Sequence, residues 1–92
     1  MIQSFADRET QRLFELGENK KDGSAARKAL FKLIQLDEAD SLKDMKAPPG
    51  NHLEALKGTR IGEYSIRIND QFRICFTWKE DGPHNVGIID YH

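Results

Sequence analysis

The chain has little from which a disulfide or a membrane anchor could be built. Its 92 residues include one cysteine, so no disulfide can close within the chain, and a reducing compartment such as the cytoplasm is expected. No apolar run approaches the ~20 residues that a membrane-spanning helix needs. The N-terminus lacks the basic start and long apolar core of a signal peptide. We therefore expect a single cytoplasmic domain, residues 1–92, that has no membrane partner.

Several catalytic motifs are also missing. The histidines at positions 52, 84 and 92 do not have the spacing of metal ligands, and there is no glycine-rich phosphate loop or G-x-S-x-G turn. Cys75 lacks an obvious histidine partner, so we expect a small buried strand residue rather than a nucleophile. Metalloenzymes, nucleotide hydrolases and thiol or serine hydrolases are all disfavoured, and we expect neither a metal nor a cofactor.

The chain also lacks a large excess of positive charge. Lysine and arginine number 14 against 15 acidic residues, for a net charge of -1. Free proteins that bind polyanions are usually basic, so this balance argues mildly against nucleic-acid binding. Net charge describes only the whole chain, however, and a local basic face could still bind nucleic acid.

Apolar residues at helical spacing predict two helices in the first half of the chain. Asp7 is a suitable N-cap and Gly17 a suitable stop for the first helix, and Ser24 is expected to cap the second. The residues expected to face the core are Leu13, Phe14 and Leu16, then Ala26, Ala29, Leu30, Leu33 and Leu36, with Phe31 and Ile34 widening the second face. Three basic residues of the second helix are expected to form a solvated strip: Arg27, Lys28 and Lys32.

After the helix-breaking segment 47–51 the apolar period changes to two, which predicts strands. The expected strands are 53–58, 64–68, 72–79 and 85–91, with a further short strand at 2–5. Turns are expected at 69–71 and 81–83. Two helices followed by an antiparallel meander indicate an α+β domain in which the helices cover one face of the sheet.

The period also fixes the register of one hairpin. Both apolar rows face the same way only if Ile68 lies opposite Phe72, which places Arg67 opposite Arg73. Like charges directly across a strand pair are destabilising, so such a pair is favoured where the surface meets an anion. Alternatively, the two arginines splay into solvent or pair with Glu63 and Asp90. Both interpretations stay open.

The basic face could be joined by other groups. Lys57 lies in the expected strand 53–58, on the face opposite Leu56, and Lys79 lies on the same face as the two arginines. The chain ends in Asp90-Tyr91-His92, directly after the apolar residues 86–89, and only histidine among unperturbed side chains changes charge near neutral pH. Fixed cations and a proton carrier are the parts that RNA cleavage by internal 2′-hydroxyl attack requires.

Several segments, in order along the whole chain, resemble the HigB toxins of the RelE-like superfamily of bacterial toxin–antitoxin systems. They are the Met-Ile-x-Ser-Phe start, Pro48-Pro49-Gly50-Asn51, Leu53-Glu54-Ala55-Leu56-Lys57-Gly58, the stretch 65–78 and Asp90-Tyr91-His92. Each piece is weak, and the ordered set is specific. The resemblance implies two helices on a curved antiparallel sheet, and a metal- and cofactor-independent endoribonuclease that enters the ribosomal A site and cuts the mRNA being translated.

The resemblance also implies partners and site residues. The expected partner is a HigA-type helix-turn-helix antitoxin, which neutralises the toxin. Operator DNA is expected to be contacted only through this antitoxin. The family's active-site motif falls on these positions: Lys57, Arg73, Asp90, Tyr91 and His92. RNA phosphates are expected to be bound by Arg67, Lys79 and Arg60.

The chain departs from the family pattern at two positions. Some relatives have histidine where this chain has Glu54, and asparagine where it has Gln71. A carboxylate beside RNA would repel the substrate unless it is paired, for example with Lys57 or Arg73. Two alternatives therefore stay open: a non-catalytic toxin like the ParE-type gyrase inhibitors, and a catalytically weak domain that binds its antitoxin and co-regulates the operon. The terminal Asp90-Tyr91-His92 favours the nuclease over the gyrase inhibitor.

Overall fold

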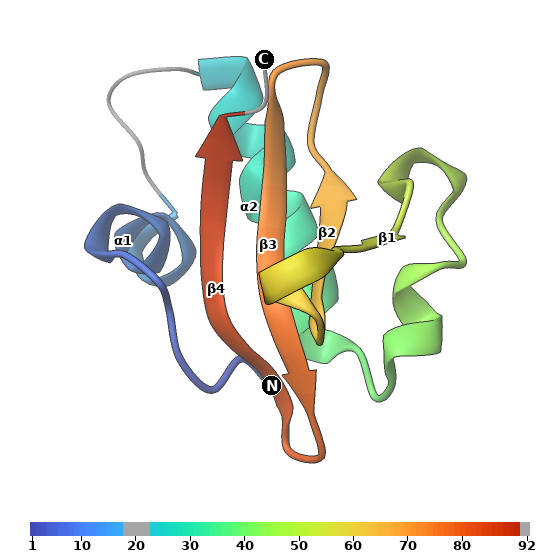
Figure 1. Ribbon diagram of the computed structural model, residues 1–92. Coiled ribbons are helices and arrows are strands. Elements are labelled where there is room, and N and C mark those ends of the chain that lie inside the picture. The colour runs from blue at the N-terminus through green and yellow to red at the C-terminus, as the bar shows by residue number, and fades with distance from the viewer. Residues whose placement is uncertain (18–22, 91–92) are drawn as a thin grey trace.

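The protein is a four-stranded antiparallel sheet with two helices packed against it (Figure 1), seen in a computed structural model that describes residues 1–17 and 23–90. The helices are α1 (Arg8–Leu16) and α2 (Gly23–Glu38). The strands are β1 (Glu54–Ala55), β2 (Glu63–Arg67), β3 (Phe72–Lys79) and β4 (Gly82–Asp90), which pair in that order. Short 3-10 turns η1 (Leu42–Met45), η2 (Pro49–Asn51) and η3 (Gly58–Arg60) lie between α2 and β2. The predicted α+β class is confirmed.

Helix α1 begins and ends where the sequence predicts. Asp7 caps it by accepting a hydrogen bond from Thr10 N at 2.7 Å, and Gly17 ends it in the left-handed region, φ 70°. The helix lies beside β4, and Thr10 Oγ1 accepts a hydrogen bond from Ile88 N at 3.2 Å. The segment expected as a strand at 2–5 runs along β4, with backbone hydrogen bonds from Gln3 N to Pro83 O at 2.8 Å and from Val86 N to Ser4 O at 3.0 Å. Its ladder is limited to one parallel bridge, Phe5 with Val86, so the prediction is confirmed only in part.

Helix α2 packs across the back of the sheet in the view of Figure 1. It begins at Gly23, so Ser24 lies in its first turn and the predicted cap is wrong. The residues with the smallest exposure form one core between α2 and the sheet: Leu33, Leu36, Met45, Ile66, Ile74, Phe76 and Val86.

Three apolar residues expected in the core face solvent instead. Leu16 is 63% exposed, Phe31 61% and Ile34 42%. The buried residues of α2, Ala29, Leu33 and Leu36, follow a stripe of four- and three-residue steps, and Phe31 and Ile34 fall outside it. A helix that packs on one sheet buries only this stripe, which is why the broader predicted face is wrong.

The β2–β3 hairpin has the predicted register. Arg67 pairs with Arg73, and Ile68 N donates to Phe72 O at 2.9 Å. The turn is closed by Asn69, whose Oδ1 accepts hydrogen bonds from Gln71 N at 2.9 Å and Phe72 N at 2.8 Å. The two arginines are therefore held across from each other by a rigid hairpin.

The other two strands differ from their predicted bounds. The expected strand 53–58 pairs only at Glu54 and Ala55, after which the chain turns through η3 and crosses in front of β3 (Figure 1). Strand β4 begins at Gly82, ahead of the predicted start, and its register shifts near Asn85, which has φ 55°. No helix in the described part of the chain is long and apolar enough to cross a membrane.

Candidate active site

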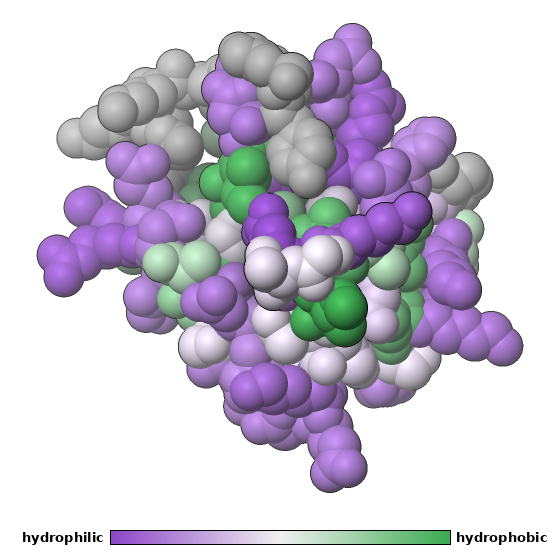
Figure 2. Space-filling view, viewed as in Figure 1, coloured by the Kyte–Doolittle hydropathy of each residue, from purple (hydrophilic) through white to green (hydrophobic). Residues whose placement is uncertain are grey.

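The face of the sheet away from α2 is polar even where it is buried. Ser65, Arg73 and Cys75 are all buried there, on strand positions that alternate with core residues such as Ile74. The segment through η3 covers part of this face. Figure 2 shows the same side of the molecule, where hydrophilic residues surround a smaller neutral and apolar area.

Arg73 is the centre of this polar face. Its side chain is 9% exposed, and its guanidinium donates to Ser65 Oγ at 2.9 Å, Ser65 O at 3.3 Å and His52 O at 2.6 Å. The acceptors are neutral, so they fix the group without cancelling its charge. The nearest carboxylate oxygen, from Glu54, lies 4.0 Å away on a side chain that is 60% exposed. Arg73 is thus an immobilised cation with a loose, solvent-accessible counterion.

Arg67 lies across from Arg73 and pairs with Asp70 in the hairpin turn. The Asp70 side chain is 98% exposed, and exposed ion pairs of this kind contribute little to stability. Among the described residues, the ion pairs of Arg67 and Arg73 are with Asp70 and Glu54, and not with the suggested partners Glu63 and Asp90. Of the two residues with which Glu54 could be paired, Arg73 is the one that lies within 4.0 Å of its carboxylate.

Arg60 and Lys57 belong to the segment around η3. Arg60 donates to Glu63 at 3.3 and 3.4 Å, and its charge acts on the thiol of Cys75. Lys57 is exposed and precedes η3, where its carbonyl accepts from Arg60 N at 3.4 Å. In the described part of the chain no ion pair or hydrogen bond joins Lys57 to Arg73, so their proposed cooperation stays a prediction.

Cys75 is buried beneath Arg60. Burial raises the pKa of its thiol above the usual value, although the charge and hydrogen bond of Arg60 and the charge of Arg73 act in the opposite direction. Glu63 adds to the rise. A thiol of raised pKa is protonated at neutral pH and is a poor nucleophile. The expectation that Cys75 is a small buried strand residue is confirmed by its 4% exposure.

Lys79 lies at the other end of β3, opposite Gly82. Six residues of strand separate it from Arg73, which corresponds to about 20 Å. It shares the polar face with the arginines but not their immediate surroundings.

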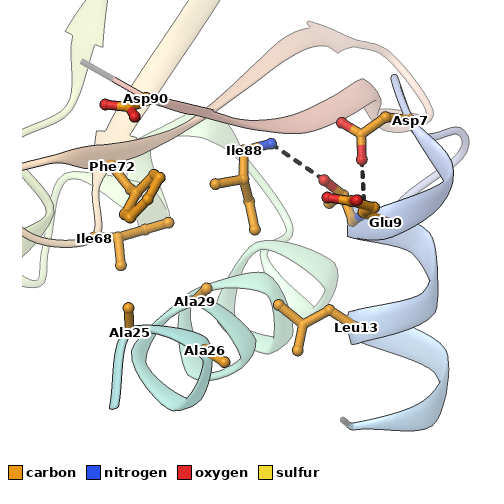
Figure 3. Close-up of a pocket in the computed structure, with 11 residues that line it drawn as sticks. Asp7, Glu9, Leu13, Ala25, Ala26, Ala29, Ile68, Phe72, Ile88 and Asp90 are labelled. Atoms are coloured by element: carbon orange, nitrogen blue, oxygen red, sulfur yellow. Dashed lines mark hydrogen bonds between the residues drawn. The ribbon is translucent and has the colours of Figure 1, made fainter. Parts of the chain in front are cut away.

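Asp90 lies on the other side of the sheet from Arg73. It pairs with Phe72, whereas Arg73 pairs with Ile89, so alternation turns Asp90 toward the helices. There it lines a cavity of about 420 Å³ between α1, α2 and the sheet (Figure 3). Its carboxylate accepts from Gln71 Nε2 at 3.1 Å. Tyr91 and His92 lie outside the described residues, so their predicted roles stay predictions.

Some polar residues of the site carried no signal that we recognised in the sequence. Asn51 is fully buried and Ser65 likewise, and His52 adopts φ 43° so that its carbonyl meets Arg73. Ser65 occupies a polar position that alternates with apolar residues of β2, a pattern that does not by itself indicate burial. It pairs with Glu54 of β1 and Cys75 of β3, and its hydroxyl accepts from Arg73.

The remaining histidine of the described chain, His84, lies on β4 close to Asp81. The two side chains are 2.5 Å apart, and the hydrogen bond from His84 lowers the pKa of Asp81. In residues 1–17 and 23–90 no group of three or more histidine, cysteine or acidic side chains is arranged to hold a metal ion. Arg73 and Arg67 are therefore the main fixed charges around which a reaction at this face could be built.

Comparisons with known proteins agree with this architecture. Residues 3–92 match the family described as RelE-like toxin of type II toxin-antitoxin system HigB. Toxin HigB-1 of Vibrio cholerae serotype O1 is 39% identical over 70 residues, covering 75% of this chain and 73% of the relative. An uncharacterized protein of Haemophilus influenzae is 33% identical over 61 residues, covering 66% of this chain and 59% of the relative.

The fold is shared more widely than the sequence. The YoeB dimer structure from Staphylococcus aureus superposes with a TM-score of 0.60, covering 99% of this chain and 94% of that chain at 21% identity. At this identity the likeness concerns the fold alone. The family match across nearly the whole chain decides the assignment: this chain belongs to the HigB family of RelE-like toxins of type II toxin–antitoxin systems.

Proposed function

We propose that this toxin is a ribosome-dependent endoribonuclease that cuts mRNA in the A site and thereby arrests translation. The observation that carries the proposal is the burial and fixed hydrogen bonding of Arg73. Its guanidinium is buried, fixed by neutral acceptors and placed across from Arg67. A preorganised cation of this kind stabilises charge that develops in a transition state without reorganising at the moment of reaction.

The reaction we propose is attack of a ribose 2′-oxygen on the adjacent phosphorus. The O2′–P bond forms and the P–O5′ bond breaks, which leaves a 2′,3′-cyclic phosphate and a 5′-hydroxyl. Arg73 stabilises the extra negative charge of the pentavalent phosphate, and Arg67 and Arg60 hold the phosphate backbone. Lys57 is the further cation of the proposed site, while Lys79 is remote and serves only RNA binding.

Two protons must move in this reaction. One leaves the 2′-hydroxyl for a general base, and one is delivered to the departing 5′-oxygen by a general acid. We assign these transfers to the C-terminal set Asp90, Tyr91 and His92, with His92 as the proton carrier because histidine is the side chain that, unperturbed, changes charge near neutral pH. Asp90 is turned toward the helices, so its part in the proposal is to position the chain end rather than to contact RNA.

The proposed partners follow from the family and from the charge. With a net charge of -1 the protein is a weak general binder of RNA, so the ribosome is proposed to present the mRNA to the local basic face. A HigA-type helix-turn-helix antitoxin is proposed to neutralise the toxin in the cytoplasm. Operator DNA would then be contacted through the antitoxin and not by this chain.

The test is expression of the chain with and without the antitoxin encoded beside it, followed by mapping of RNA 5′ ends in arrested cells. We expect cuts inside translated codons, abolished in an Arg73→Ala variant and kept in an Arg27→Ala variant, which removes an exposed arginine of α2. Growth arrest with intact mRNA and damaged DNA would instead indicate a gyrase inhibitor.

A second function is favoured by one specific observation. Glu54 places a carboxylate 4.0 Å from Arg73, where it competes with a phosphate for that cation. A catalytically weak toxin that mainly binds its antitoxin and co-regulates the operon would tolerate this arrangement. Normal growth and intact mRNA on expression, together with tighter operator binding by the antitoxin in the presence of this chain, would support it.

A further inference from the structure

Lys32 of α2 does not extend into solvent with the rest of the basic strip. It is half-buried, and its ammonium group donates a hydrogen bond to Oδ1 of Asn51. Asn51 is fully buried, and its Nδ2 donates to Met45 O at 3.1 Å, which fixes the orientation of the amide. The prediction of a solvated strip is therefore wrong for Lys32.

This contact gathers three cations around one turn of the chain. Asn51, the last residue of η2, holds Lys32, and the next residue, His52, accepts from Arg73. Arg67 lies across from Arg73. Burial lowers the pKa of the Lys32 ammonium group, and the positive charge of Arg67 lowers it further. The turn thus lies between a cation from the helix layer and cations from the sheet.

The negative charges around this cluster are few and exposed. Arg67 has Asp70, and Arg73 has the more distant Glu54, with side chains 98% and 60% exposed. Within residues 1–17 and 23–90 Lys32 forms no ion pair. Bringing like charges together on a folded surface costs free energy, which an anion bound between them would offset.

We propose that Lys32 binds a backbone phosphate next to the one held by Arg67 and Arg73, so that the RNA strand passes over η2 from the sheet toward α2. The proposal rests on the proposed function, since it names a binding residue for the same substrate class. The ligand is a phosphodiester of RNA, from the mRNA or from the ribosomal RNA around it. Lys32 is a binding residue here and takes no part in proton transfer.

The test measures binding rather than cleavage. Labelled full-length protein is titrated with ribosomes carrying an mRNA methylated at the A-site 2′-hydroxyls, which cannot be cut, at several salt concentrations. We expect Lys32→Gln to bind about fivefold more weakly, with a salt slope smaller by about 0.7, the value for one phosphate contact to a single strand. Lys32→Arg should retain most of the binding, because it keeps the charge.

The matched control is Lys28→Gln, which removes an exposed lysine of the same helix and should leave affinity and slope unchanged. Repeating the titration with ribosomes that lack mRNA separates the two sources: a loss confined to programmed ribosomes assigns the phosphate to mRNA, and a loss on both assigns it to ribosomal RNA. Both outcomes support the phosphate site.

Lys32→Gln that binds like Lys28→Gln overturns the proposal, and a drop in melting temperature without a change in salt slope would show that Lys32 only supports Asn51. Wild-type protein that fails to bind ribosomes also overturns it. Wild-type protein that binds with the expected Lys32 dependence but leaves a cleavable mRNA intact would remove the proposed function and keep the binding site.

Discussion

The two faces of the central hairpin are buried to similar depth but by different chemistry. Toward α2, Ile74 and Phe76 are at 0% and 1% exposure and belong to the apolar core, whereas on the opposite face Arg73 and Cys75 are at 9% and 4%. Burying apolar surface is favourable, but burying a guanidinium costs free energy unless its donors are paired. The arginine face therefore adds little to stability for the area it hides, and this difference supports the proposal that it is the functional face.

The largest effect that this comparison predicts concerns the chain end. If His92 carries a proton, His92→Gln should lower single-turnover cleavage on ribosomes by about 10²–10⁴-fold, the usual reach of positioned acid–base catalysis. Ribosome binding should change little, because one partly charged group is small beside the arginines. Unchanged cleavage by a chain that ends at Tyr91 would contradict the assignment and leave Lys57 and Arg73 as the candidates.

On the apolar face the largest effect should be on stability. Phe76→Ala removes a side chain at 1% exposure and is expected to lower the free energy of unfolding by about 3–5 kcal/mol, the range for large-to-small core changes. Urea unfolding measures this loss. Phe31→Ala, on an exposed side chain of α2, is the control and should change stability by less than about 0.5 kcal/mol. Similar losses for both variants would mean that α2 packs differently.

On the polar face an alanine substitution should affect activity more than stability. Arg73→Ala is expected to raise the cleavage barrier by about 2–4 kcal/mol, as for loss of one preorganised charge-stabilising group. It also leaves Ser65 Oγ and His52 O without their donor, which costs about 1–3 kcal/mol of stability, less the relief of repulsion from Arg67.

The stability of the Arg73 variant can be separated from its activity. Ser65→Ala removes one acceptor of the guanidinium and keeps the cation, so it should affect stability with a smaller loss of cleavage. Cleavage by Arg73→Ala that returns to normal when the temperature is lowered would show that Arg73 acts through folding alone.

The sequence predicted the hairpin well because its evidence is local. Alternation and the short turn at Asn69 leave one register in which both apolar rows face the core, and that register is the observed one. The cap at Asp7 and the stop at Gly17 were likewise decided by neighbouring backbone groups. The strand expected at 53–58 was overestimated, because only Glu54 and Ala55, both exposed, pair with β2 before the chain turns through η3.

The candidate site was harder to predict because its contacts join segments far apart in the chain. Arg73 could be named from the register and the resemblance, but not its burial, which depends on the loop that brings His52 to it. Lys32 looked like part of a solvated strip, and only the tertiary placement of Asn51 shows otherwise. Asp90 was expected with the arginines, and the bulge-shifted register of β4 turns it to the helix side.

A smaller effect should follow from substitution of Glu54, the acidic residue beside Arg73. Glu54→Gln keeps the shape of the side chain and removes the charge 4.0 Å from Arg73, so a substrate phosphate no longer competes with it. We expect cleavage or ribosome binding to improve by up to about fivefold, because exposed pairs are worth no more than about 1 kcal/mol. Glu63→Gln, at the neighbouring Arg60 pair, serves as a comparison. Lower activity in the Glu54 variant would make this carboxylate a part of the mechanism.

The smallest expected effect is the pH dependence of stability that arises from Cys75 on the polar face. Burial raises the pKa of the Cys75 thiol in the folded state, so the folded protein holds this proton more tightly than the unfolded chain. Its contribution to stability is complete below the unfolded value, about 8.5, and is lost as the pH rises through the higher folded value. The free energy of unfolding of the wild type should therefore fall more steeply above about pH 8.5 than that of Cys75→Ala, which lacks the thiol. The same burial should make the thiol react slowly with an alkylating reagent at neutral pH, and faster after denaturation. Parallel pH profiles for the two proteins, with rapid alkylation of the folded wild type, would show that the arginines beside Cys75 outweigh its burial and that this face is more open than its exposure indicates.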